Sequence, residues 1–159
     1  TDFRSLGLRA GDLIDITSTM YGYTSKVFRV TKIAEDHSIS EATVTHLLDR
    51  YGSLIEEVLA LIAEDASLSE RIIPELAYLK AEILHAVTHE GALSVEDVLL
   101  RRTRISFEAF DGGADAAKEV AKIIGEPLGW GAKERSASVS AFLAVIEKEE
   151  EALVELINS

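Results

Sequence analysis

The chain has 159 residues, 47% of them hydrophobic, which is enough for one folded domain with a core. It has no cysteine, which excludes disulfides and thiolate sites and agrees with the cytoplasmic location that we expect. Twenty-eight acidic residues against sixteen basic ones give a formal net charge of −12, which disfavours nucleic acid and anionic membrane surfaces as partners. The longest apolar run, Val58 to Ala63, is too short to span a bilayer, and we expect neither a transmembrane segment nor a signal peptide.

The first segment, residues 1–33, is rich in β-forming residues and predicts a β-hairpin. Residues 13–17 and 26–31 both have the composition of strands, and the second run alternates, with Phe28 and Val30 on one side. Glycines at positions 11 and 22 punctuate the segment as turns do. Because an isolated hairpin is marginally stable in water, we expect it to pack on the rest of the chain.

From residue 34 to residue 159 the hydrophobic period becomes helical. Leu47, Leu48 and Tyr51 continue an i, i+3, i+4, i+7 pattern that begins at Val44, and Gly52 follows as a stop signal. The segment predicts a compact, mainly α domain of about five to six helices. With the hairpin, this gives a mainly α fold class and two segments, 1–33 and 34–159.

Four further signals mark helix boundaries in the second half of the chain. Pro74 suits the first position of a helix that ends at Gly91, and Ser94 with Asp97 caps the next one. Asp111-Gly112-Gly113 predicts a break before a helix over residues 114–124. A last helix over residues 132–157 is expected to bury Val139, Phe142, Leu143, Ile146, Leu153 and Ile157.

Three arginines, Arg101, Arg102 and Arg104, gather within four positions of this acidic chain. They lie at or just past the predicted end of the helix that Ser94 caps, where positive charge complements the helix dipole. Asp97 is four residues before Arg101, the spacing of an ion pair on one helix face. Guanidinium groups also bind phosphates and carboxylates, but we favour a structural or interdomain role over ligand binding.

A second constellation comprises Glu82, His85, His89 and Glu90. The spacing of Glu82 and His85, and that of His85 and His89, each places two possible metal ligands on a common helix face. A di-iron bundle needs a second E-x-x-H motif, which the chain does not contain. A zincin needs a glutamate directly after the first histidine, whereas Glu90 follows the second one. We therefore predict no metal site and interpret these residues as ordinary polar positions on a half-buried helix.

Motifs for the common chemistries do not occur in the sequence. There is no G-x-G-x-x-G fingerprint, no G-x-x-x-x-G-K-[ST] phosphate loop and no G-x-S-x-G elbow. Residues 38–51 resemble a DNA-reading helix pair only weakly, because Arg50 is the one arginine or lysine there against Glu41 and Asp49. We predict no catalytic and no cofactor-binding residue in this chain.

Three stretches together resemble one enzyme family. They are HLLDRYGSLIEEVLALIAED from His46, YLKAEILHAVTHEGALSVEDVLLRRTRI from Tyr78, and LGWGAKERSASVSAFLAVIEKE from Leu128. In order and spacing, residues 32–149 resemble the C-terminal helical domain of the bacterial FAD-dependent glycerol-3-phosphate dehydrogenases. The R-Y-G, H-E, D-V-L-x-R-R-T-R and L-G-W elements are specific in combination and weak one by one.

The resemblance implies that the chain is the non-catalytic end of an oxidoreductase that converts glycerol 3-phosphate to dihydroxyacetone phosphate. In that family an N-terminal portion binds FAD and substrate, so the implied partner is that portion, and FAD belongs to the parent enzyme only. The parent enzyme is then cytoplasmic or peripheral on the inner face of the cell membrane. The matching motifs give a set of structural or interdomain ion-pair candidates, namely His89, Glu90, Asp97, Arg101, Arg102 and Arg104.

Residues 1–31 do not match this family and weakly resemble β modules of phage tail proteins. The alternative hypothesis is therefore a structural or protein-interaction module, as a fusion or chimera with no enzymatic role, in which the hairpin would be the working part.

Overall fold

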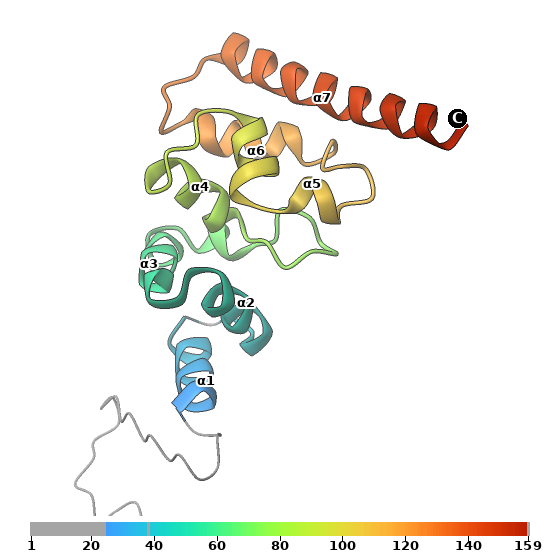
Figure 1. Ribbon diagram of the computed structural model, residues 1–159. Helices are drawn as coiled ribbons and strands as arrows, with labels where there is room; N and C mark the ends of the chain where they lie inside the picture. Colours follow the sequence, from blue (N-terminus) through green and yellow to red (C-terminus); the bar gives the residue numbers. More distant parts are fainter. Residues whose placement is uncertain (1–24, 38, 159) are drawn as a thin grey trace, which may run out of the picture. The chain divides into compact units, whose positions relative to one another are not determined.

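The computed structural model describes residues 25–37 and 39–158, and these residues are mainly helical (Figure 1). Within them Arg71 and Leu79 form an isolated β-bridge, and no strand occurs. None of the described helices is both long and apolar enough to cross a bilayer. The helices are α1 (Ser25–His37), α2 (Glu41–Tyr51), η2 (Gly52–Leu54), α3 (Ile55–Glu64), η3 (Ala66–Ser69), α4 (Lys80–Thr88), η4 (Asp97–Arg102), α5 (Ile105–Glu108), α6 (Ala117–Gly125) and α7 (Ala132–Asn158).

The predicted hairpin is wrong in its second strand. Residues 26–31 lie within α1, which runs from Ser25 to His37, while the first strand, residues 13–17, lies outside the described residues. The alternation that predicted a strand covers only six residues, which is too short to distinguish a strand from a helical segment. β-branched residues also lower helix propensity by only a few tenths of a kcal/mol each, so Val27, Val30 and Thr31 are tolerated in a helix.

The chain divides into two compact units, residues 1–45 and residues 46–159. In the first unit, Ser40 caps the start of α2: its Oγ accepts a hydrogen bond from the Thr43 N–H (3.1 Å), and its carbonyl accepts one from the Val44 N–H (3.0 Å). A surface ion pair between Lys32 and Asp36 (3.5 Å) bridges one turn of α1.

The second unit has one hydrophobic core, to which α4, η4, α6 and α7 contribute. In it α6 packs on both α4 and α7, and α3 packs on α4 (Figure 1). Ile83 of α4, Leu99 of η4, Ile124 of α6 and Phe142 of α7 are all fully buried there. This core fixes the position of α4, which carries the polar residues described below.

Boundary predictions were confirmed where a side chain caps a helix and failed at Pro74. Ser94 Oγ accepts from the Asp97 N–H (3.0 Å), and the break at residues 111–113 is real, with φ of +85° at Gly113. Pro74, however, begins no helix. The chain turns there between Arg71 and Leu79, the Ile72 N–H donates to the Tyr78 carbonyl (3.0 Å), and α4 begins at Lys80.

The last helix was predicted with nearly correct bounds but too much buried surface. Val139, Phe142 and Ile146 are buried as expected, whereas Leu143, Leu153 and Ile157 are 37%, 57% and 79% exposed. The apolar period continues along α7, but its C-terminal part extends past the other described helices of the unit (Figure 1), so those helices do not bury it. An amphipathic pattern thus indicates which face of a helix is apolar and does not say how far the core reaches.

Candidate functional site

Glu82 is a fully buried carboxylate in the first turn of α4 and the centre of a polar network. One carboxylate oxygen accepts a hydrogen bond from the Leu79 N–H (2.7 Å), which satisfies an otherwise unpaired donor at the helix start. His46 Nε2 lies 3.1 Å from both carboxylate oxygens, and Arg50 Nε lies 3.1 Å from Oε1. His46 and Arg50 are four residues apart on α2, so one face of that helix supplies both partners.

Arg50 connects this carboxylate to two aromatic rings and to a distant backbone segment. Its guanidinium carbon lies 5.4 Å from the Tyr51 ring centroid and 5.1 Å from that of Tyr78. One terminal nitrogen donates to the Arg102 carbonyl (2.6 Å). The Nε contact with Glu82 is ionic, because its alignment does not make a hydrogen bond.

Burial and charge shift the pKa values within the network. Burial acts to lower the pKa of Arg50. The interaction with Tyr51, which is charged only in the strongly alkaline range where Arg50 itself titrates, and that with the Glu82 charge outweigh burial, so the pKa of Arg50 is raised. The pKa of Tyr51 is raised well above its usual range, mainly by burial and then by the charge of Glu82. Burial also raises the pKa of Tyr78, aided by its hydrogen bond to Glu108. Both phenols therefore stay neutral at physiological pH.

His85 forms the second half of the network on the same face of α4. It is 1% exposed, and its Nε2 lies 3.0 Å from Glu57 Oε2 on α3. Its ring stacks on His89 with centroids 4.6 Å apart and an interplanar angle of 7°, and Tyr51 contacts it edge-on at 5.1 Å. Nδ1 is buried without a hydrogen-bond partner among the described residues, and Glu90 Oε1 lies 3.9 Å from it.

The arrangement links α2, α3 and α4 through charge pairs rather than presenting a reactive group to solvent. Removing one member of a buried ion pair typically costs about 3–5 kcal/mol, because the other charge is left unpaired. The Glu82 carboxylate is surrounded by two hydrogen-bond partners, His46 and the Leu79 N–H, and by the Arg50 guanidinium, so little of its capacity is left for a ligand. Its geometry fits a structural role.

The predicted ion pair between Asp97 and Arg101 is present, with Arg101 Nη1 2.5 Å from Asp97 Oδ1. Arg101 also contacts Glu96 (2.5 Å), but its side chain is 58% exposed, so these pairs stabilise the fold only slightly. Asp97 further accepts from the Leu93 N–H (3.0 Å). Burial acts to raise the pKa of Asp97, but the bonds from Leu93 and Arg101 outweigh it and lower the value.

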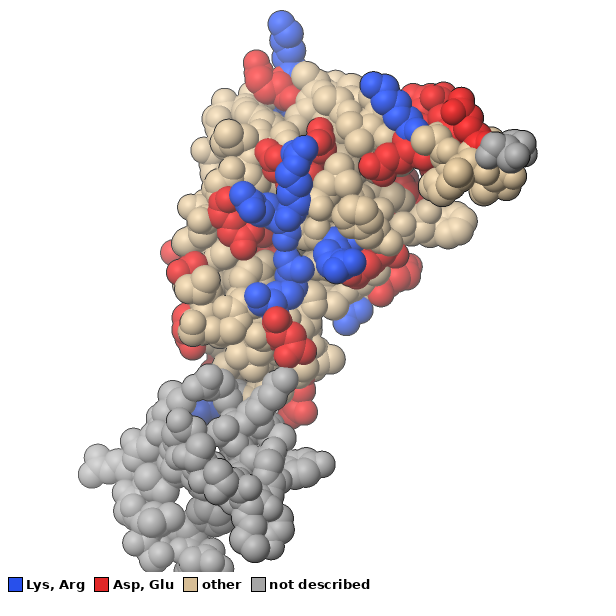
Figure 2. Space-filling model, viewed as in Figure 1, with Lys and Arg blue, Asp and Glu red and all other residues tan. Residues whose placement is uncertain are grey.

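The other two arginines are arranged differently. Arg104 is exposed and lies 3.9 Å from Glu108, and the exposed Arg102 makes no ion pair with a described residue, although its carbonyl accepts from Arg50. A band of basic side chains runs down the face seen in Figure 2, with acidic side chains on both sides. The structure therefore separates the arginine cluster into one internally paired member and two outward ones.

Of the six candidate residues, His89 and Glu90 meet the buried network with their side chains, both through His85, and Arg102 meets it with its carbonyl, which accepts from Arg50. The sequence analysis missed His46, Arg50 and Glu57 as functional positions. The four-residue spacing of His46 and Arg50 on one helix face was an available signal, but their partner is more than thirty residues away in sequence. Periodicity within one helix cannot identify such a partner.

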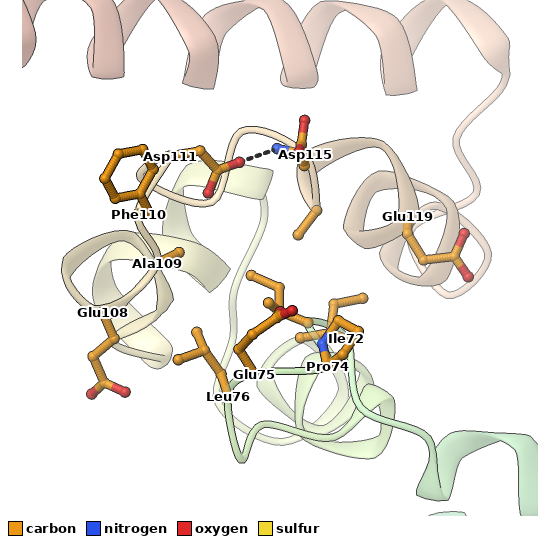
Figure 3. A pocket seen from close by; sticks show the side chains of 12 residues that line it. Ile72, Pro74, Glu75, Leu76, Glu108, Ala109, Phe110, Asp111, Asp115 and Glu119 are labelled. Atoms are coloured by element: carbon orange, nitrogen blue, oxygen red, sulfur yellow. Dashed lines mark hydrogen bonds between the residues drawn. The ribbon is translucent and has the colours of Figure 1, made fainter.

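A cleft of about 550 Å³ lies elsewhere in this unit, between residues 72–76 and residues 108–119 (Figure 3). Its lining combines apolar side chains such as Ile72 and Leu76 with acidic ones. Asp111 is fixed there by accepting from the Asp115 N–H (2.7 Å), the bond that mainly lowers its pKa. Phe110, wholly exposed, stands at the edge.

Fold and site together define a helical domain held by a buried charge network. The sequence profile of the family described as the C-terminal domain of alpha-glycerophosphate oxidase matches residues 19–135, most of the chain. The chain belongs to this family. The matched range includes residues 19–31, which the sequence analysis had placed outside it.

Individual relatives agree with this assignment. "Glycerol-3-phosphate dehydrogenase 2" of Mycobacterium bovis and "Glycerol-3-phosphate dehydrogenase" of Mycobacterium leprae are each 42% identical over 128 residues, 80% of this chain and 22% of the relative. "Glycerol-3-phosphate dehydrogenase" of Synechocystis is 35% identical over 96 residues, 60% of this chain and 16% of the relative. The chain thus spans about a fifth of the length of these relatives. No solved structure matches it.

Proposed function

We propose that this chain is the non-catalytic C-terminal helical domain of a flavin-dependent glycerol-3-phosphate dehydrogenase. The observation that carries the proposal is the extent of the match: residues 19–135 match the family's C-terminal domain, and the chain covers only 22% of the mycobacterial dehydrogenases. The oxidation of glycerol 3-phosphate to dihydroxyacetone phosphate, and the FAD that it requires, then belong to the N-terminal portion of the parent enzyme.

The buried network supports a structural role for this domain. Glu82, Arg50 and His46 are engaged with one another inside the domain, and they connect α2 to α4. The parent enzyme would use the domain as a rigid body whose exposed residues meet the flavin-binding portion. The cytoplasmic location, with the parent held peripherally at the inner face of the membrane, is proposed from the resemblance alone.

Arg102 and Arg104 are the members of the arginine cluster that we assign to this interface. Both are exposed, and Phe107, three residues after Arg104, is 66% exposed. Exposed aromatic side chains together with arginines are typical of protein interfaces. Arg101 is satisfied by Glu96 and Asp97 and is assigned to the domain itself. His89 and Glu90 are assigned to the domain as well, because both contact His85.

The experiment is a calorimetric titration of this chain into the separately expressed flavin-binding portion of such a dehydrogenase. We expect Arg102→Ala/Arg104→Ala to weaken binding by roughly 2- to 30-fold, the loss of two exposed ion pairs. The matched control, Lys133→Ala/Lys148→Ala, removes the same charge from exposed positions of α7 and should bind as the unchanged chain does. Failure of the folded chain to bind, or equal weakening by both double variants, would remove the proposed interface.

The alternative of an independent module built around a β-hairpin loses one of its motivating features, because residues 26–31 are helical. Deletion of residues 1–18, which precede the family match, discriminates further. We expect the deleted chain to bind the flavin portion with unchanged affinity.

A further inference from the structure

We propose that Glu57, His85 and His89 form a binding site for a divalent transition-metal ion, best suited to Zn²⁺. The three residues each offer one ligand atom, and these atoms lie within 4.8 Å of one another. Two imidazoles and one carboxylate are ligands that zinc takes readily, with a fourth position left for water. The sequence analysis rejected a metal here because neither the di-iron nor the zincin motif is complete, and it did not consider Glu57, which α3 supplies.

The backbone places the two histidines for a shared ligand. His85 and His89 are one helical turn apart at the end of α4, and their rings are stacked 4.6 Å apart, so a shared ion requires the His89 ring to turn its nitrogen toward it. Glu57 Oε2 is 3.0 Å from His85 Nε2, close to the separation of about 3.4 Å between two ligand atoms on one tetrahedral zinc. Only His89 has to approach further, and it is exposed at the C-terminal cap of the helix, where its side chain can rotate.

The hydrogen bonds around His89 leave one ring nitrogen, Nε2, free to bind a metal. The Thr88 hydroxyl has a single proton, which it donates to the Leu84 carbonyl (3.0 Å). With the proton so assigned, its contact with His89 Nδ1 (2.7 Å) is a bond that it accepts from a protonated Nδ1. The neutral ring then has its lone pair on Nε2, available for coordination.

His85 provides a second, independent indication. Its Nδ1 is buried and has no hydrogen-bond partner among the described residues, an arrangement with a cost in free energy that usually has a reason. When a metal replaces the proton on Nε2, the remaining ring proton moves to Nδ1, and a small movement of Glu90, whose Oε1 lies 3.9 Å away, would let this carboxylate accept it. A metal-bound histidine whose other nitrogen donates to a carboxylate is the usual outer-shell arrangement of protein metal sites.

The ion would join α3 to α4 next to the buried charge network. Glu82 takes no part, because its oxygens are already directed to His46, Arg50 and Leu79. The role that follows is structural. The metal adds a further link between two helices that already pack together and share the Glu57–His85 hydrogen bond. This inference does not rest on the proposed interface with a flavin domain.

The test is a calorimetric titration of the full 159-residue chain, without a histidine tag, with zinc chloride. We expect one Zn²⁺ per chain, and at least about 100-fold weaker binding in His89→Ala and Glu57→Gln, more than an outer-shell change causes. Glu90→Gln should weaken binding by about 10- to 100-fold. Glu56→Gln is the matched control: it removes the same charge from the adjacent, exposed residue of α3 and should leave binding unchanged.

His37→Ala, in the other unit, controls for binding to any histidine and should also leave the titration unchanged. As a second measurement, saturating Zn²⁺ should raise the thermal unfolding midpoint of the unchanged chain and of both controls, and not that of His89→Ala. No saturable binding, or binding that survives both His89→Ala and Glu57→Gln, would overturn the proposal. The latter result would assign the zinc to the acidic surface of the chain.

Discussion

Glu82→Gln isolates the charge of the buried carboxylate while keeping its size and an oxygen for the Leu79 N–H. The change leaves Arg50 and His46 facing a neutral amide at 3.1 Å. Removing one charge of a buried ion pair typically lowers the free energy of unfolding by about 3–5 kcal/mol, and we expect a loss of about 3 kcal/mol here. The lower end applies because the Arg50 and His46 side chains are 22% and 16% exposed and can be partly hydrated when their partner is lost.

The assay is urea unfolding followed by far-ultraviolet circular dichroism. With a slope of about 1–3 kcal/mol per molar urea, a loss of about 3 kcal/mol lowers the midpoint by about 1–3 M. Glu56→Gln makes the same chemical change at an exposed position and should stay within about 0.5 kcal/mol of the unchanged chain. If Glu82→Gln costs no more than Glu56→Gln at an unchanged slope, the network does not stabilise the domain as argued.

A double-mutant cycle tests whether Arg50 acts through Glu82. Arg50→Met removes the charge and keeps much of the apolar volume between the Tyr51 and Tyr78 rings. The double variant Arg50→Met/Glu82→Gln should lose less free energy of unfolding than the two single variants together, by about 0.5–3 kcal/mol. Each single variant leaves a buried charge without its partner, whereas the double variant removes both charges. Strict additivity would show that the two side chains act independently.

Three further predictions concern other parts of the domain. Folding lowers the pKa of Asp97, so its carboxylate stabilises the folded state fully above its ordinary pKa of about 3.9. This stabilisation is lost as the pH falls through the lower pKa of the folded state. Asp97→Asn should therefore reduce the free energy of unfolding at neutral pH and leave it equal to that of the unchanged chain at the low pH of acid unfolding. Gly113→Ala should lower the free energy of unfolding by about 1–2 kcal/mol for its positive φ, plus a packing penalty, because the new methyl carbon would lie 3.2 Å from a buried isoleucine. Gly91→Ala, with φ of +72° and no atom within 4 Å, should show only the roughly 1–2 kcal/mol for the positive φ in the same urea assay. Phe142→Ala should cost about 3–5 kcal/mol and Leu153→Ala less than about 0.5 kcal/mol, and equal costs would contradict the exposure of the end of α7.

Local signals in the sequence were sufficient where the structure is determined locally. Ser94 caps a helix because its hydroxyl lies three residues from the N–H that it accepts from, and Gly113 breaks the chain because of its own backbone angle. The prediction of a strand over residues 26–31 was wrong because six alternating residues are too few to distinguish the two-residue period of a strand from the 3.6-residue period of a helix. The predicted burial of Leu153 and Ile157 at the end of α7 was wrong because burial depends on how far the other helices of the core extend.

The candidate sites show the same division between local and distant partners. The Asp97–Arg101 pair could be predicted because both members lie on one turn. Glu82 and His85 could be placed on one face of α4, but their partners are on α2 and α3, at separations of 36 and 28 residues. No periodicity within α4 contains that information, so the sequence alone could not identify these partners.

The concentration of positive charge at residues 101–104 follows from two separate requirements. One turn earlier, Glu96 and Asp97 place two carboxylates at the start of η4, and Arg101 neutralises them within the domain. The backbone directly after it is held by Arg50, which donates to the Arg102 carbonyl and thereby connects this corner to the buried carboxylate. The side chains of Arg102 and Arg104 are left pointing outward on a positioned backbone. In a chain with a net charge of −12, we propose these two outward arginines as a recognition feature for an acidic surface of the flavin-binding portion.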